Sequence, residues 1–381
     1  MRFVKKKSSL ILSGLFFLSF LLNLIAWNSR EFCDFYVKYI FPAWVNTYGR
    51  FTGLFSFSTG EIMLAVAVVA VVAALILIIT AAGFTLARRK YAEKLRYCCR
   101  RFLRGMLWVT AVVSIVMTCN CFILYHCSTF EEKYQVKGGE YKISELAAVR
   151  DYVVRQANAL AKEIERDEQG NILYDGNMKA EATASMERLG SQGYEQLAGY
   201  YPQPKGIMAS GFLSQQYMLG YYFPFSMEAN YNDVMHITNK PATMCHELAH
   251  LKGFIYEDEA NFLGYLACIH SDDKLFRYSG YLSVLNYLDN AFYQAVGEDR
   301  DIYRSHVKIS GQVKKDNVFL TEKTWEKVEK KAVVSTAAVK KASRAFVDTN
   351  QKVNGIEDGI ASYNRVVGLL LDYYDGVLYR I

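Results

Sequence analysis

The chain has 381 residues, more than a single typical domain, and 52% of them are hydrophobic. Its net charge of +6 is uneven, because residues 1–104 carry 15 basic and 4 acidic side chains and the rest of the chain carries 29 and 34. A basic excess confined to the apolar first third indicates membrane topology and excludes nucleic acid as the partner.

Three uncharged apolar runs in the first third predict transmembrane helices, at about residues 10–27, 62–87 and 105–128. At about 1.5 Å per residue, each is long enough to cross a hydrocarbon core of about 30 Å. The first run lacks the small-x-small cleavage site of a signal peptide, so we expect it to remain as an anchor.

Basic residues mark one side of these runs. Lys5, Lys6 and Lys7 precede the first run, and eight Lys and Arg residues lie in the predicted loop at 88–104. The positive-inside rule places both segments in the cytoplasm and everything after the third run outside. We therefore predict a multi-pass protein of the cell membrane, with a membrane domain at 1–128, a cytoplasmic N-terminus and an extracytoplasmic domain at 129–381.

The predicted outer domain is large enough for one well-buried core and is mostly helical in pattern. Six helices are expected from apolar periodicity and end signals, besides the one discussed next: 144–166, 179–189, 257–270, 281–296, 321–350 and 362–379. A strand is expected within 211–231. The fold class is thus mainly α: three transmembrane helices followed by a mostly helical α+β domain with a small sheet.

The pattern His246-Glu247-x-x-His250 carries the chemistry of the chain. Histidines four apart lie on one face of a helix, so both imidazoles can bind a single Zn²⁺. Glu247 is then placed to hold the metal-bound water as the general base. Pro241 and Gly253 bound a helix of about three turns. The competing interpretation is a pair of core histidines bonded to backbone carbonyls.

A third ligand is expected from the acidic cluster seven residues beyond His250. We predict Glu257, because Asn261 would then lie one turn along the same helical face and hydrogen-bond a ligand histidine. Glu259 is the alternate ligand. Two imidazoles and one carboxylate suit zinc and leave a coordination position for water.

The HExxH helix followed by Glu-x-x-Ala-Asn resembles the gluzincin branch of zinc peptidases. More narrowly, three spans followed by CHELAH at 245–250, GF at 253–254 and EDEANF at 257–262 resemble an uncharacterised bacterial membrane family, domain of unknown function 3810. The resemblance implies a zincin-like catalytic region. By analogy with zincins, the segment 227–237 is expected to form the edge strand with which a peptide substrate pairs.

These features predict a membrane-anchored zinc metallopeptidase whose partners are the lipid bilayer and a peptide or protein substrate. A non-catalytic zinc- or peptide-binding sensor, or a structural membrane protein, is the alternative. Cleavage within or near the bilayer is disfavoured, because the motif lies 118 residues past the last predicted span. Spacing does not choose among five candidate donors to the oxyanion: His270, Tyr278, Tyr281, His306 and Tyr363.

Overall fold

The computed structural model describes residues 2–87, 90–136, 138–353 and 362–380, most of which are helical. The α-helices are α1 (Arg2–Asn28), α2 (Arg30–Phe35), α3 (Phe41–Trp44), α4 (Arg50–Thr52), α5 (Thr59–Leu86), α6 (Ala92–Met117), α7 (Phe130–Tyr134), α8 (Ile143–Glu163), α9 (Met178–Ser191), α10 (Ser210–Gln215), α11 (Lys240–His250), α12 (Glu257–Ile269), α13 (Lys274–Ala295), α14 (Arg300–Ser305), α15 (Gly311–Asp316), α16 (Glu322–Lys331), α17 (Thr336–Val353) and α18 (Ser362–Tyr374). The π- and 3₁₀-helical turns are η1 (Tyr36–Ile40), η2 (Val45–Gly49), η3 (Thr118–Phe122), η4 (Leu124–His126), η5 (Glu195–Leu197) and η6 (Ile237–Asn239), and the strands are β1 (Lys205–Ile207), β2 (Gly220–Phe223) and β3 (Glu228–Asn232).

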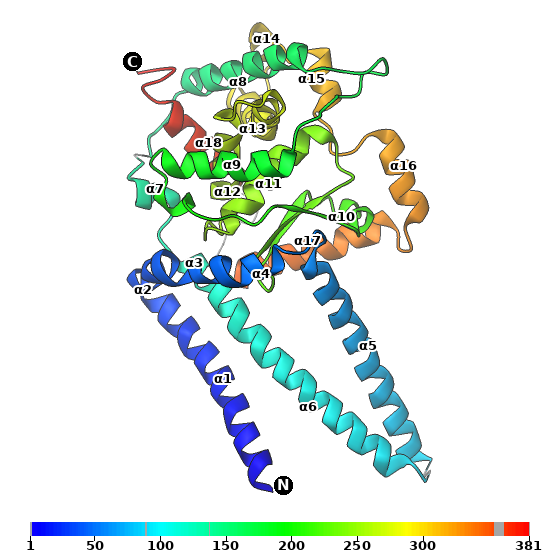
Figure 1. Ribbon diagram of the computed structural model, residues 1–381. Coiled ribbons are helices and arrows are strands. Elements are labelled where there is room, and N and C mark those ends of the chain that lie inside the picture. The colour runs from blue at the N-terminus through cyan, green and yellow to red at the C-terminus, as the bar shows by residue number, and fades with distance from the viewer. Residues whose placement is uncertain (1, 88–89, 137, 354–361, 381) are drawn as a thin grey trace.

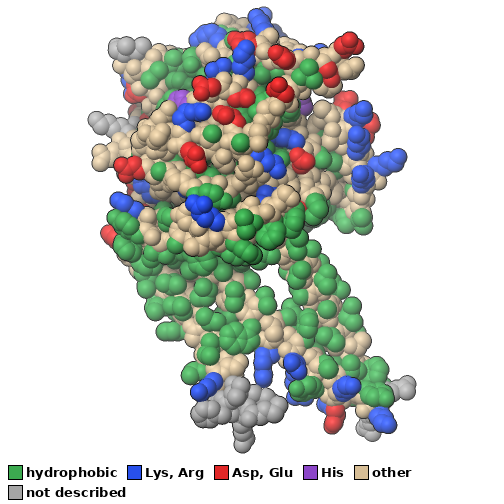
Figure 2. Space-filling view, viewed as in Figure 1, with side chains coloured by type: hydrophobic (Ala, Val, Ile, Leu, Met, Phe, Trp, Pro, Cys, Tyr) green, Lys and Arg blue, Asp and Glu red, His purple; other side chains and the backbone are tan. Residues whose placement is uncertain are grey.

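Three helices are long and apolar enough to cross a membrane: Lys7–Asn28, Thr59–Leu86 and Ala92–His126. They extend from one side of the remaining chain (Figure 1), with hydrophobic side chains along them and Lys and Arg at their far ends (Figure 2). The three predicted apolar helices are confirmed. The third begins earlier than predicted, at Ala92 rather than 105, because the Arg- and Leu-containing segment before 105 favours helix and continues the span.

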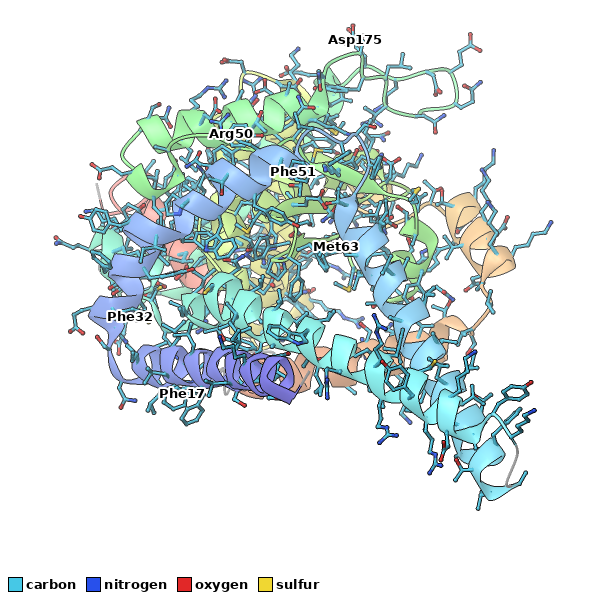
Figure 3. All side chains as sticks on the ribbon, turned by 60° about the horizontal axis from the view of Figure 1, so that its bottom comes forward. Phe17, Phe32, Arg50, Phe51, Met63 and Asp175 are labelled. Atoms are coloured by element: carbon cyan, nitrogen blue, oxygen red, sulfur yellow. The ribbon has the colours of Figure 1, made fainter. Side chains whose placement is uncertain are left out.

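The segment between the first two spans, predicted only as an outer loop, is an almost continuous run of helical turns from α2 to α4. It crosses the domain-side ends of the spans from Phe32 to Phe51 (Figures 1 and 3). Val37 and Phe41 are buried in the core of the domain, whereas Tyr39 and Phe51 are 62% and 58% exposed. Exposed aromatic side chains at this level are typical of a membrane–water interface.

The predicted helices of the C-terminal region are largely confirmed, with three changes. The helix expected at 281–296 begins earlier, at Lys274 in α13, and the final helix ends at Tyr374. The helix expected at 321–350 is two helices, α16 and α17. The break between α16 and α17 begins at Ala332, whose backbone is extended. It contains Val333 and Val334, a β-branched pair that would lose side-chain freedom in a helix.

The three strands form a sheet in the order β1-β3-β2. β3 pairs in parallel with β1 and antiparallel with β2, in which Tyr222 lies opposite Ala229. The strand predicted within 227–237 is present as β3, but its predicted role as the edge strand is wrong, because β3 has a partner on each side. Among the described strands, β1 and β2 each have one edge without a partner, and β2 is the outer strand that lies against Glu247 of the motif.

Glu228 of β3 attaches this sheet to the second span. Its buried carboxylate accepts hydrogen bonds from the backbone N–H groups of Thr59 and Gly60, at 3.1 and 2.9 Å, and pairs with buried Lys205. The N–H groups at a helix start have no partner within the helix and favour negative charge. Glu228 thus caps α5 from the central strand.

Candidate metal centre

The helix expected to carry the metal site is α11, which is buried almost all round. Pro241 lies in its first turn, and Gly253 follows it with a φ of +88°, which favours glycine. α12 packs closely against it at Gly264, where a Cβ atom would lie 3.0 Å from the backbone nitrogen of His246. This close approach brings the acidic start of α12 beside the histidines.

The two motif histidines face each other across the surface of α11. Their Nε2 atoms are 3.1 Å apart and their rings are nearly perpendicular. Nδ1 of His250 lies 2.7 Å from the carbonyl oxygen of Phe254. When Nδ1 donates its hydrogen to that oxygen, Nε2 keeps a lone pair directed at the site, as a metal ligand requires.

The two candidate third ligands lie in different surroundings. Oxygens of Glu257 are 3.2 Å from Nε2 of His246 and 3.9 Å from Nε2 of His250. Glu259 is buried and accepts a 2.6 Å hydrogen bond from the backbone of Phe130 in α7. The geometry therefore brings Glu257 and not Glu259 to the histidines.

Asn261, expected as a partner of a ligand histidine, forms a side-chain contact with His246 that helps to raise the pKa of this ring. The contact is loose, since Nδ1 of His246 has no hydrogen-bond partner within the described part of the chain.

Glu247 is 4% exposed and lies beside both histidines, and the three side chains offer ligand atoms within 4.8 Å of one another. Burial raises the pKa of its carboxyl to about 8, although His246 and a hydrogen bond from the backbone N–H of Tyr222 act in the opposite direction. Its Oε2 has no hydrogen-bond partner among the described residues. One buried oxygen of Glu247 is thus available to a water molecule.

The pKa values of His250, His246 and Glu257 are shifted in different directions. Burial lowers the pKa of His250 to about 4, and the neighbouring charge of His246 adds to this. Burial also acts against a charge on His246, but the hydrogen bond to Glu257 outweighs it and raises the pKa of this ring to about 9. Partial burial favours the neutral form of Glu257, yet the hydrogen bond and charge of His246 lower its pKa. In the metal-free protein, a proton on His246 therefore links the groups that a cation would hold.

The spacing of these atoms fits a metal ion. Two Zn–N bonds of about 2.0–2.1 Å at a tetrahedral angle place their nitrogens about 3.3 Å apart, close to the observed 3.1 Å. The donor set of two imidazoles and a carboxylate suits zinc. Glu247, whose Oε2 has no hydrogen-bond partner in the described part of the chain, lies beside it.

Four of the five expected oxyanion donors have partners elsewhere: His270 with Tyr373, His306 with Asp151, Tyr278 with Asp316 and Tyr281 with Tyr152. The side chain of the fifth, Tyr363, lies outside the described residues. The sequence analysis missed Tyr222 and Gly220 of β2. The Tyr222 ring lies 6.1 Å from His250, and a Cβ atom at Gly220 would lie 2.7 Å from Oε1 of Glu247.

The metal face, which His246, His250 and Glu257 form, lies at the domain-side end of the third span. The hydroxyl of Tyr222 donates to the backbone oxygen of Asn120, and that of Tyr256 donates to the oxygen of Tyr125. Asn120 and Tyr125 belong to the last turns of Ala92–His126. The distance of 118 residues along the chain is therefore not a distance in space, and the reason given against chemistry near the bilayer is wrong.

Comparison with family models matches residues 36–371 to the family described as "Protein of unknown function (DUF3810)". No curated protein and no solved structure matches the chain.

Proposed function

The chain belongs to the DUF3810 family of proteins of unknown function, as its motifs predicted, and we propose that it is a membrane-anchored, zinc-dependent metallopeptidase that acts outside the cytoplasm. One observation carries this proposal. The Nε2 atoms of His246 and His250 and the carboxylate of Glu257 lie within 4 Å of one another. The buried carboxylate of Glu247 offers a ligand atom within 4.8 Å of those of the histidines and retains an oxygen without a partner among the described residues.

In this proposal, His246, His250 and Glu257 hold the zinc. A bound zinc ion would lower the pKa of water and polarise the substrate carbonyl. Glu247 takes a proton from the attacking water and returns it to the leaving amine. Hydrolysis thereby adds one water across the peptide bond and yields a carboxylate and an amine. The Phe254 carbonyl keeps His250 in the tautomer that binds metal.

The open edge of β2 supports a peptide as the substrate. An extended peptide adds to such an edge through backbone hydrogen bonds. The N–H of Tyr222 lies on this edge, since it bonds Glu247 rather than β3. A peptide paired with β2 would therefore pass beside the proposed general base.

The proposal is tested with the full chain purified in detergent, loaded with zinc and incubated with a pool of unstructured peptides. We expect Glu247→Gln to lower the rate of hydrolysis by about 10²–10⁴-fold while the zinc content stays at the wild-type value. Glu259→Gln is the matched control, because it makes the same change at a buried glutamate turned toward α7. Hydrolysis that survives in Glu247→Gln would contradict the mechanism. A wild-type protein that binds zinc and cuts no peptide would favour the sensor instead.

A further inference from the structure

The β2–β3 hairpin joins the metal face to two membrane-spanning helices. Phe223, at the end of β2, packs on the first turn of α5, where a Cβ atom at Gly60 would lie 2.7 Å from its ring. The next residue, Pro224, accepts a 3.0 Å hydrogen bond from Asn120, which follows α6. The tip of the hairpin is thus held between the domain-side ends of the second and third spans (Figure 1).

β2 leads from this point to the proposed general base. Its four residues run from Phe223 beside α5 to Gly220, which lies against Glu247. At about 3.3 Å per residue, this distance is about 10 Å. The second edge of β2 has no partner among the described strands, and on this edge the N–H of Tyr222 bonds Glu247. Another extended chain that pairs along this edge would therefore meet the carboxylate of Glu247 at Tyr222.

The spans leave an opening at the start of the path. Figure 2 shows open space between α5 and the neighbouring spans, directly beneath the domain. Apolar side chains are exposed along both α5 and α6, including Val66, Val69, Val109 and Val112. In a bilayer this space takes lipid or another apolar helix, because neither leaves a polar group without a partner.

We propose that the site acts on polypeptides anchored in the same membrane, with the transmembrane helix of the substrate in the opening beside α5 and the adjoining extended segment paired with β2. This inference rests on the proposed peptidase function. Its support is continuity, because a chain that leaves the bilayer at the hairpin reaches Glu247 after about 10 Å. Backbone pairing makes little demand on sequence. The distance from the bilayer therefore selects the bond, and we expect cleavage within about six extended residues, or about 20 Å, of the substrate's helix.

The exposed aromatic side chains of α2–α4 support the same geometry. Tyr39 and Phe51 are exposed in the segment that crosses the domain-side ends of the spans (Figure 1), and would hold the domain at the membrane surface. The proposed path along β2 then begins at the interface and does not open into bulk water alone.

The test uses the full, zinc-loaded chain in liposomes with three probes that share a pool of ten randomised residues. In the first probe, the randomised pool is joined directly to a Leu/Ala transmembrane helix, and it is made in two versions, with the pool before or after the helix. In the second, a flexible spacer of twenty residues separates pool and helix, and in the third the pool is free. We expect cleavage of anchored probes at least tenfold faster than that of the free pool. In both anchored probes, mass spectrometry should place the cuts within about six residues of the helix. Equal rates for free and anchored pools, or cuts spread along the spacer, would overturn the inference and leave the peptidase intact.

Binding is measured separately, so that the two proposals can fail independently. Glu247→Gln, with a photo-reactive residue in place of Tyr221 on β2, is irradiated with each probe. If Glu247→Gln crosslinks to anchored probes that the wild type does not cut, the proposed membrane-anchored partner would stand and the proposed peptidase activity would be overturned. Absence of both crosslinking and cleavage would overturn both proposals.

Discussion

Glu257 and Glu259 show how one helical face decides a residue's role. Both begin α12, and the sequence alone left both open as the third ligand. Residues 257, 260, 261 and 264 share a face at helical spacing, and Gly264 packs against the backbone of His246. That contact turns Glu257 toward the histidines and Glu259 toward α7. A glycine seven residues after Glu257 was thus a usable signal in the sequence.

At the same scale, Gly220→Ala tests the contact between β2 and the general base. The added methyl group would lie 2.7 Å from Oε1 of Glu247 and 2.6 Å from the backbone oxygen of Asn230, so β2 must shift. We expect a loss of about 1–3 kcal/mol in unfolding free energy, at least a tenfold loss of peptidase activity and an unchanged metal content. Gly211→Ala is the control, because nothing lies within 4 Å of its added Cβ. Full activity in Gly220→Ala would show that β2 does not need this close approach.

At the scale of elements, local signals succeeded where a helix carries its own pattern. The metal helix, the stop signal at Gly253 that follows it and the start of α12 were predicted from periodicity and end signals. The sheet was not predictable in this way, because the position of β2 depends on pairing with β3 and on contacts with Asn120 and Gly60. Such long-range contacts leave no periodic trace in so short a strand.

The attachment of the sheet to α5 is tested by Glu228→Gln. This change leaves Lys205, which is 3% exposed, without a counter-charge, and breaking a buried ion pair costs about 3–5 kcal/mol. We expect a clearly lower midpoint of thermal unfolding in detergent, partly restored in the double variant with Lys205→Met. Asp233→Asn breaks the more exposed pair with Lys240 and should change stability by about 0–1 kcal/mol. Equal effects of the two single substitutions would contradict the role given to Glu228.

For the molecule as a whole, the positions of the basic residues and the lengths of the apolar runs together predict a single membrane topology. The three apolar helices are present, and Lys and Arg side chains of these helices gather at the ends opposite the domain (Figure 2). The two-domain boundary at 128/129 and the orientation in the membrane remain predictions. Residues 30–52 belong to the predicted membrane domain in sequence, yet Val37 and Phe41 are buried in the core of the domain.

The orientation is tested by labelling Cys98, the exposed cysteine near the far end of α6. A membrane-impermeant maleimide should reach Cys98 only from the cytoplasmic side, because the positive-inside rule places the basic end of α6 there. Asp272→Cys, at a position whose side chain is fully exposed near the end of α12, should react only from the opposite side. Reaction of Cys98 from the outside, with or without reaction of the Asp272→Cys variant from that side, would contradict the predicted topology.

The metal content of the purified full chain tests the central claim most directly. Wild type and Glu259→Gln are expected to hold about one zinc per chain after loading and dialysis, whereas His246→Ala and Glu257→Ala should hold little, because each loses one of three ligands. Thermal unfolding that stays at the wild-type midpoint in the metal-free state would show that the variants remain folded. Absence of zinc from the wild type after loading, or full zinc content in His246→Ala, would contradict the claim that these residues form a metal site.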